Sequence, residues 1–220
     1  MFIPKAISVL GRAGCGKGTQ SDLLVEKFGL EYFGSGESLR ARAKKADFTG
    51  KKTAEVMAKG ELVPAFVISN LWMDALEELK QKKGFKGIVF DGTPRKLAEA
   101  KFLEDALKWY EWDKNRKVVL IEVSEKESFN RLTKRRQCEK CKKVIPWIGD
   151  FKKMDKCHKC GGKLIFRTDD KPTAIRKRLA EYKSEVVPVI HYYNLQEKLV
   201  RVNGEQSIED VFKDILKAIQ

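Results

Sequence analysis

The sequence contains no long hydrophobic run and no region of low complexity. Its apolar stretches fall well short of the roughly 18 residues that a membrane span needs. The first ten residues carry Pro4 and Lys5 inside the only candidate signal region. There is no linker of biased composition and no internal repeat apart from a doubled CxxC. These absences predict a soluble, unprocessed chain with no membrane partner.

Cysteines are few and odd in number, which argues against a disulfide scaffold. The chain has 5 cysteines, and four of them form two CxxC pairs at residues 138–141 and 157–160. That spacing is more typical of a metal site in a reducing compartment than of paired disulfides. We therefore expect a cytoplasmic location.

Acidic side chains are too few to balance the basic ones. There are 31 Asp and Glu residues against 45 Lys and Arg residues, which gives a net charge of +14. Such a surplus attracts polyanions, including nucleic acid, anionic membrane faces and nucleotide phosphates. Charge alone does not choose among these partners. No Ser-His-Asp or Cys-His set that would indicate a covalent mechanism is visible.

Short apolar runs alternate with helical patterns along the 220 residues. Strands are predicted at residues 6–10, 32–33, 87–91, 117–123 and 199–202. A helical stripe runs from Ile208 to Ile219, and Ser207 and Asp210 form a capping box before it. The alternation predicts an α/β fold, a doubly wound parallel sheet of about five strands with helices on both faces. Residues 35–64 and 137–167 interrupt it as insertions over the strand ends.

The turn after the first strand is rich in glycine. Residues 11–19 read GRAGCGKGT, a variant of the P-loop pattern in which Gly18 separates Lys17 from Thr19. Glycines let backbone N–H groups converge on phosphate oxygens, and Lys17 supplies an ammonium for the outer phosphates. The alternative is a turn that binds nothing, and the Cys15 thiol is expected to be incidental. The expected phosphate-binding residues are Gly14, Cys15, Gly16, Lys17, Gly18 and Thr19.

This turn resembles the phosphate loop of the nucleoside monophosphate kinases, which usually have proline where Ala13 stands. Three more segments follow in that family's order: GSGESLR at 34–40, GELVP at 60–64 and DGTPR at 91–95. The resemblance implies that arginine forks bind the acceptor phosphate and that the first residue of DGTPR orients magnesium-bound water. The implied AMP-binding residues are Ser35, Arg40, Glu61, Leu62, Val63, Gly92, Arg95, Glu99, Arg167 and Arg178.

Two of these positions bear on the acceptor base. Ser35 keeps the hydroxyl of the threonine found in adenylate kinases, but Glu99 replaces the glutamine that reads adenine. A carboxylate accepts from the exocyclic amine and donates to the neighbouring ring nitrogen only when protonated. AMP is the expected acceptor, and another nucleoside monophosphate is the alternative. Glu99 can also be read as an exposed charge on a helix, and Met57 and Leu62 are more simply read as packing residues.

The two CxxC pairs are separated by fifteen residues, the spacing of a zinc ribbon. With four thiolate ligands the site is closed, so zinc would fold the insertion and do no chemistry. His158 is then a spare, exposed residue. This insertion resembles the lid of the long-form adenylate kinases, whereas uridylate and cytidylate kinases have short lids. The expected zinc ligands are Cys138, Cys141, Cys157 and Cys160.

Basic residues flank this insertion. Arg131 and Arg135 are four apart on a predicted helix and should project from one face. The resemblance implies that both bind the ATP donor, with Val144 and Ile145 near its base and Arg201 contacting that base through the backbone.

A second group of charged residues follows the insertion. By resemblance, Arg167 and Arg178 close on the phosphates during transfer. Asp169 and Asp170 between them are also expected to cap a helix that begins at Pro172.

Together these resemblances imply an adenylate kinase, in which a monomer transfers a phosphoryl group from Mg-ATP to AMP and gives two ADP. They imply a core of residues 1–34, 65–136 and 168–220, an NMP-binding subdomain at 35–64 and a zinc lid at 137–167. The alternative from another class is a zinc-ribbon protein that binds nucleic acid and uses the loop as a switch. The implied catalytic residues are Lys17, Asp91, Arg95, Arg131, Arg135, Arg167 and Arg178.

Overall fold

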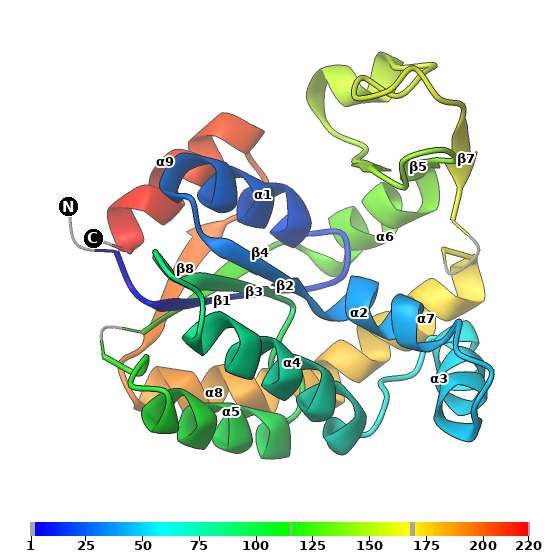
Figure 1. Cartoon of the computed structure of the whole chain (residues 1–220). Coiled ribbons are helices and arrows are strands. Elements are labelled where there is room, and N and C mark those ends of the chain that lie inside the picture. The colour runs from blue at the N-terminus through cyan, green and yellow to red at the C-terminus, as the bar shows by residue number, and fades with distance from the viewer. Residues whose placement is uncertain (1–2, 115, 168–169, 220) are drawn as a thin grey trace.

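Five parallel strands form the central sheet of the computed structural model, which describes residues 3–114, 116–167 and 170–219 (Figure 1). In spatial order they are β2 (Glu31–Gly34), β3 (Ile88–Asp91), β1 (Ala6–Leu10), β4 (Lys117–Glu122) and β8 (Leu199–Asn203). In the register, Ala6 lies beside Ile88 and Ile7 beside Lys117. The predicted α/β class and parallel sheet are confirmed.

Helices cover both faces of the sheet (Figure 1). One layer contains α1 (Lys17–Phe28) and α9 (Ile208–Ala218), and the other contains α4 (Ala65–Lys80), α5 (Leu97–Trp109) and α8 (Val187–Leu195). The central strand is buried throughout because its side chains alternate between the layers: Ile7 packs in one cluster with Leu24 of α1, and Ala6 in another with Trp72 of α4.

The Ser207 half of the capping box predicted for the last helix is present. The Ser207 hydroxyl accepts a hydrogen bond from the backbone N–H of Asp210 at 3.1 Å, and α9 begins at the next residue, Ile208. The apolar stripe of α9 then places Val211 and Ile215 against β1 and β4.

The first insertion lies after β2 and contains two helices. They are α2 (Ser35–Arg42) and α3 (Phe48–Ala58). Asp47 caps α3 by accepting from the backbone N–H of Gly50 at 2.8 Å. The insertion therefore begins at the carboxyl end of an edge strand, where ligands bind in open α/β sheets.

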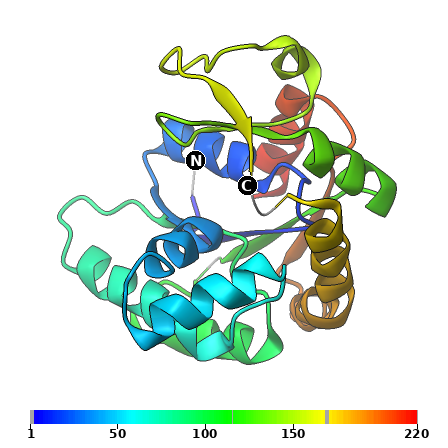
Figure 2. The ribbon, with the colours of Figure 1, turned by 90° about the vertical axis from the view of Figure 1, so that its right-hand side faces the viewer.

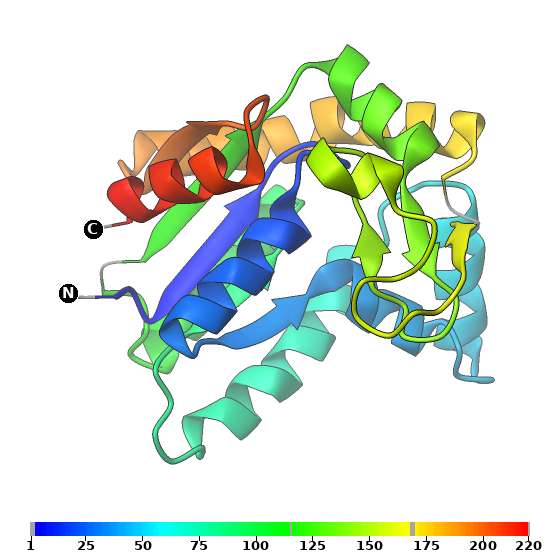
Figure 3. The same cartoon turned by 90° about the horizontal axis from the view of Figure 1, so that it is seen from above.

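The second insertion is a small antiparallel sheet, with strands β5 (Arg136–Cys138), β6 (Val144–Ile145) and β7 (Leu164–Phe166) and the 3-10 turn η1 (Gly149–Lys153). Helix α6 (Glu125–Lys134) leads into it and α7 (Pro172–Glu181) follows it, joined to α8 by the π-helical turn η2 (Tyr182–Val186). We call residues 136–166 the lid. Figure 2 shows the lid above, with α2 and α3 below, and Figure 3 shows the lid beyond the end of α1.

No helix in the described part of the chain is both long enough and apolar enough to cross a membrane.

Candidate active site

The phosphate loop joins β1 to α1 at the carboxyl edge of the sheet. Gly16 adopts φ +104° as the N-cap of α1, a conformation that favours glycine, and no side chain caps the helix there. The N–H groups of the first turn are therefore left for an anion. The Lys17 ammonium donates to the carbonyl oxygens of Gly11 and Arg12, both at 2.9 Å, so it lies over the same loop.

Asp91 ends β3 beside the start of α1. A Cβ atom on Gly18 would lie 3.2 Å from Asp91 Oδ2, so glycine after the lysine lets this carboxylate approach the loop. The Tyr32 hydroxyl donates to Asp91 Oδ2 at 3.0 Å. Burial, and then the charge of Asp91, raise the pKa of Tyr32 above its usual range. Tyr32 was predicted only as part of a strand, and its contact with Asp91 depends on the pairing of β2 with β3.

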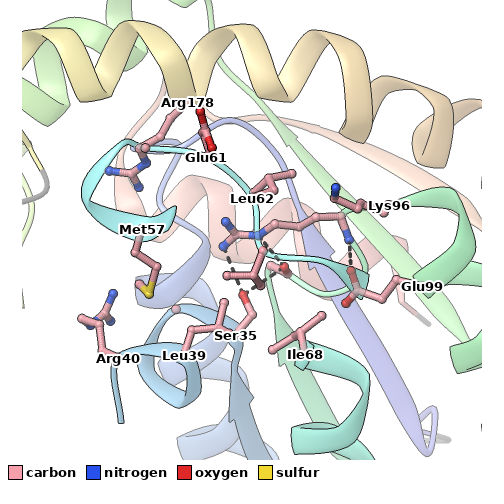
Figure 4. Close-up of a pocket in the computed structure, with 15 residues that line it drawn as sticks. Ser35, Leu39, Arg40, Met57, Glu61, Leu62, Ile68, Lys96, Glu99 and Arg178 are labelled. Carbon is pink, nitrogen blue, oxygen red and sulfur yellow. Dashed lines mark hydrogen bonds between the residues drawn. The ribbon is translucent and has the colours of Figure 1, made fainter. Parts of the chain in front are cut away.

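A pocket that is open to solvent adjoins this corner (Figure 4). Its walls come from α2, the end of α3 and the segment after it, the start of α4, the turn after β3, the start of α5, and α7. It contains all the acceptor residues expected from the sequence except Arg167: Ser35, Arg40, Glu61, Leu62, Val63, Gly92, Arg95, Glu99 and Arg178. Segments far apart in the sequence thus form one concave site, the usual form of a small-molecule pocket.

Hydrogen bonds within the pocket fix the position of Arg95. Its Nε donates to the Gly92 carbonyl at 2.8 Å, and its Nη2 donates to Ser35 Oγ at 3.1 Å. The Ser35 hydroxyl in turn donates to the Gly92 carbonyl at 3.0 Å. The arginine predicted to bind the acceptor phosphate is therefore held by the turn that follows β3.

Glu99 lies in α5 and is buried, with 2% of its surface exposed, so the alternative of an exposed helix charge is wrong. Its Oε2 accepts from the backbone N–H of Arg95 at 2.8 Å, whereas Oε1 has no hydrogen-bond partner among the described residues. Burial raises the pKa of Glu99 to about 7 even though Arg95 and Lys96 lower it. The carboxyl group is therefore partly neutral at physiological pH.

Asp170 gathers three of the predicted catalytic arginines. Its carboxylate accepts two hydrogen bonds from Arg135, at 2.7 and 2.8 Å, and one from Arg178 at 3.0 Å. Arg167 Nε lies 3.9 Å from the same group. The expectation that Asp170 caps α7 is wrong, because Lys171 is the N-cap and makes no side-chain cap, while the arginines occupy the carboxylate. The partner aspartate in that prediction, Asp169, lies outside the described residues.

Arg131 and Arg135, predicted to project from one helix face, have different partners. Arg131 is a buried residue of α6 that donates to Glu127 Oε1 at 2.6 Å and to the Gly204 carbonyl at 3.1 Å. Arg135 follows the helix as its C-cap, and the chain becomes extended there, with a ψ of 138°. Its side chain pairs with Asp170.

The four cysteines of the lid form one cluster. All their sulfur atoms lie within 4.8 Å of one another, with Cys138 and Cys160 3.4 Å apart and Cys141 and Cys157 3.6 Å apart. Four thiolates around zinc at 2.3 Å would be about 3.8 Å apart, so the arrangement fits a tetrahedral site. His158 is exposed, as expected, and meets the Phe151 ring edge-on.

A comparison with known protein families identifies the family of this chain. The family model described as adenylate kinase matches residues 9–198. The chain belongs to the adenylate kinase family. Among proteins named adenylate kinase, that of Archaeoglobus fulgidus is 40% identical over 94% of each chain, and that of Petrotoga mobilis is 37% identical over 96% of this chain and 95% of its own. The family resemblance inferred from the motifs is confirmed.

The remaining residues predicted for a family donor site lie apart from the pocket. Arg201, on β8, donates to Glu122 Oε1 of the neighbouring strand β4 at 2.7 Å. In the lid, Ile145 is buried and Val144 only partly so, which leaves Val144 the more accessible of the two to a ligand.

Sequence reasoning missed part of the pocket lining. Met57 was expected only to pack, and it both packs against the core and lines the pocket. Three of the missed positions lie within the quoted acceptor motifs, but nothing in a motif tells which of its apolar or glycine residues face a ligand. The other unpredicted lining residues are Gly36, Leu39, Gly60, Ile68 and Lys96.

Proposed function

We propose that the protein transfers the terminal phosphoryl group of ATP to AMP and gives two ADP. The observation that carries this proposal is that the phosphate loop and the arginine-lined pocket meet at one corner. Asp91 faces the loop beside Gly18, and the next residue, Gly92, lines the pocket. A donor phosphate on the loop and an acceptor phosphate in the pocket would therefore approach each other.

In this reaction an oxygen of the AMP phosphate attacks the γ-phosphorus of ATP, and the bond to the β–γ bridging oxygen breaks. The protein mainly has to align these groups and neutralise their charge. Loop N–H groups and Lys17 would hold the donor, and Arg40 and Arg95 the acceptor. Arg131, Arg135, Arg167 and Arg178 are proposed to neutralise the phosphoryl group in transit.

Two metal ions are part of the proposal. Asp91 would hold, through water, the Mg²⁺ that arrives with ATP, and that ion neutralises phosphate charge. Zinc bound by the four cysteines would only fold the lid. Free thiolate ligands fit the reducing cytoplasm. The protein is proposed to act there as a monomer. The nucleic-acid alternative has less support, because the match to the kinase family covers both the loop and the pocket.

Replacing Lys17 with methionine tests the proposal. Loss of the ammonium removes charge that stabilises the transferring group, so kcat for ADP formation should fall by about 10²–10³-fold. Lys27→Met, at an exposed position of the same helix, is the matched control. Full activity of Lys17→Met, with an unchanged melting temperature, would refute the proposed role of the loop.

The acceptor is tested with a panel of AMP, CMP, UMP, GMP and dAMP, with ATP as donor. We expect AMP to give the highest kcat/KM at neutral pH.

A further inference from the structure

Glu99 lies at the end of the pocket away from Arg40 and Arg178. Figure 4 shows Arg40 and Arg178 on one side and Glu99 on the other, with Ser35 between them. A nucleoside monophosphate that places its phosphate on the guanidinium groups would direct its base towards Glu99. This placement rests on the proposed function.

One oxygen of Glu99 is paired and the other is not. The backbone N–H of Arg95 donates to Oε2 at 2.8 Å, so Oε2 must act as an acceptor. Oε1 is buried and has no partner in the described part of the chain. A buried polar atom without a partner is costly, and a ligand that pairs with it recovers that cost. Oε1 is thus the atom left for a base to pair with.

The charged groups around Glu99 act in both directions. Arg95 and Lys96 come from the turn just before α5, next to Glu99. The other walls of the pocket contribute Arg40 from α2, Glu61 from the segment after α3, and Arg178 from α7. Burial raises the pKa of Glu99 to about 7, although the backbone N–H of Arg95 and the charges of Arg95 and Lys96 favour the carboxylate. Both forms of the side chain are therefore available near neutral pH.

We infer that Glu99 binds adenine as a neutral carboxylic acid, with Oε1–H donating to the ring nitrogen beside the exocyclic amine. Because Oε2 accepts from Arg95, the proton belongs on Oε1. A neutral acid then offers one donor and one acceptor, as a glutamine amide does. The ionised form has no donor. It suits a 6-oxopurine instead, because hypoxanthine carries a proton on that ring nitrogen.

The test is calorimetric titration of AMP and IMP between pH 6.0 and 8.5. If only the neutral acid binds adenine, the apparent Kd for AMP should rise by about 30-fold across this range, since the competent fraction falls above a pKa of about 7. IMP should bind more tightly as pH rises. At pH 8, repeating the titration in buffers of different ionisation enthalpy should show uptake of close to one proton per AMP bound.

Glu99→Gln supplies the matched variant. Its amide keeps a donor and an acceptor at every pH, so the only remaining pH dependence should be that of the AMP phosphate, which the wild type shares. Asp105→Asn changes an exposed carboxyl group of the same helix, outside the pocket, and should keep the wild-type pH profile.

Identical AMP profiles for the wild type and Glu99→Gln, or no proton uptake, would overturn the inference. If Glu99→Gln does not fold, proton uptake by the wild type decides alone. Failure of the proposed function looks different, because ATP and AMP would then give no ADP at any pH.

Discussion

The sheet and the lid are stabilised in different ways. Strand β1 is fully buried between two helical layers, and its contacts join residues more than a hundred positions apart. In the lid, Cys138, Ile145 and Cys157 are the only buried residues, and two of these belong to the cysteine cluster. The sheet therefore depends on long-range apolar burial, and we expect the lid to depend on a metal held by its cysteine cluster. The lid should be able to lose its structure while the sheet keeps its own.

Removing zinc should have the largest effect. It should unfold the lid and leave the sheet folded. Structural zinc contributes about 10–16 kcal/mol of apparent binding free energy in small domains, so chelation should unfold the lid. Hydrogen exchange should show loss of protection at residues 136–166, while β1 and β4 stay protected. Adding zinc back, but not magnesium, should restore protection. Exchange of β1 at the same rate as the lid would contradict this division.

Asp170→Ala probes the junction between the two regions. This change leaves three arginines without their buried carboxylate, and breaking such a cluster costs about 3–5 kcal/mol. The free energy of unfolding, measured in urea, should fall by that order, and sulfate should recover part of it by pairing with the arginines. Asp150→Ala, at an exposed position of the lid, is the control. Equal effects of the two changes would show that the cluster does not join the regions.

Ser207→Ala should have the smallest effect and should act on the sheet region alone. Loss of the helix cap should lower the free energy of unfolding by about 1 kcal/mol. Ser207→Thr keeps the hydroxyl, so this variant should retain most of the stability that the cap contributes. Thermal unfolding measures both. Hydrogen exchange in the lid should stay unchanged. If it changed as much as hydrogen exchange in α9, the two regions would not be independent.

The features that were predicted correctly are local in the sequence. The phosphate loop, the two CxxC pairs and the Ser207 cap each lie within a few residues, so their chemistry is readable from spacing. The alternation of strands and helices likewise follows from periodicity. The acceptor residues were found through motif order, and the structure then brings most of them into one pocket.

The sequence by itself determined the sheet, the loop and the cysteine cluster, because hydrophobic period and cysteine spacing are short-range properties. Only the tertiary structure decided the partners of the charged groups. Asp170 binds arginines from two helix ends instead of capping α7, and burial decides between the two readings of Glu99, a base-binding residue or an exposed charge, against the second. The physical reason is that the pairing and the pKa of an ionisable group depend on which distant residues exclude water from it.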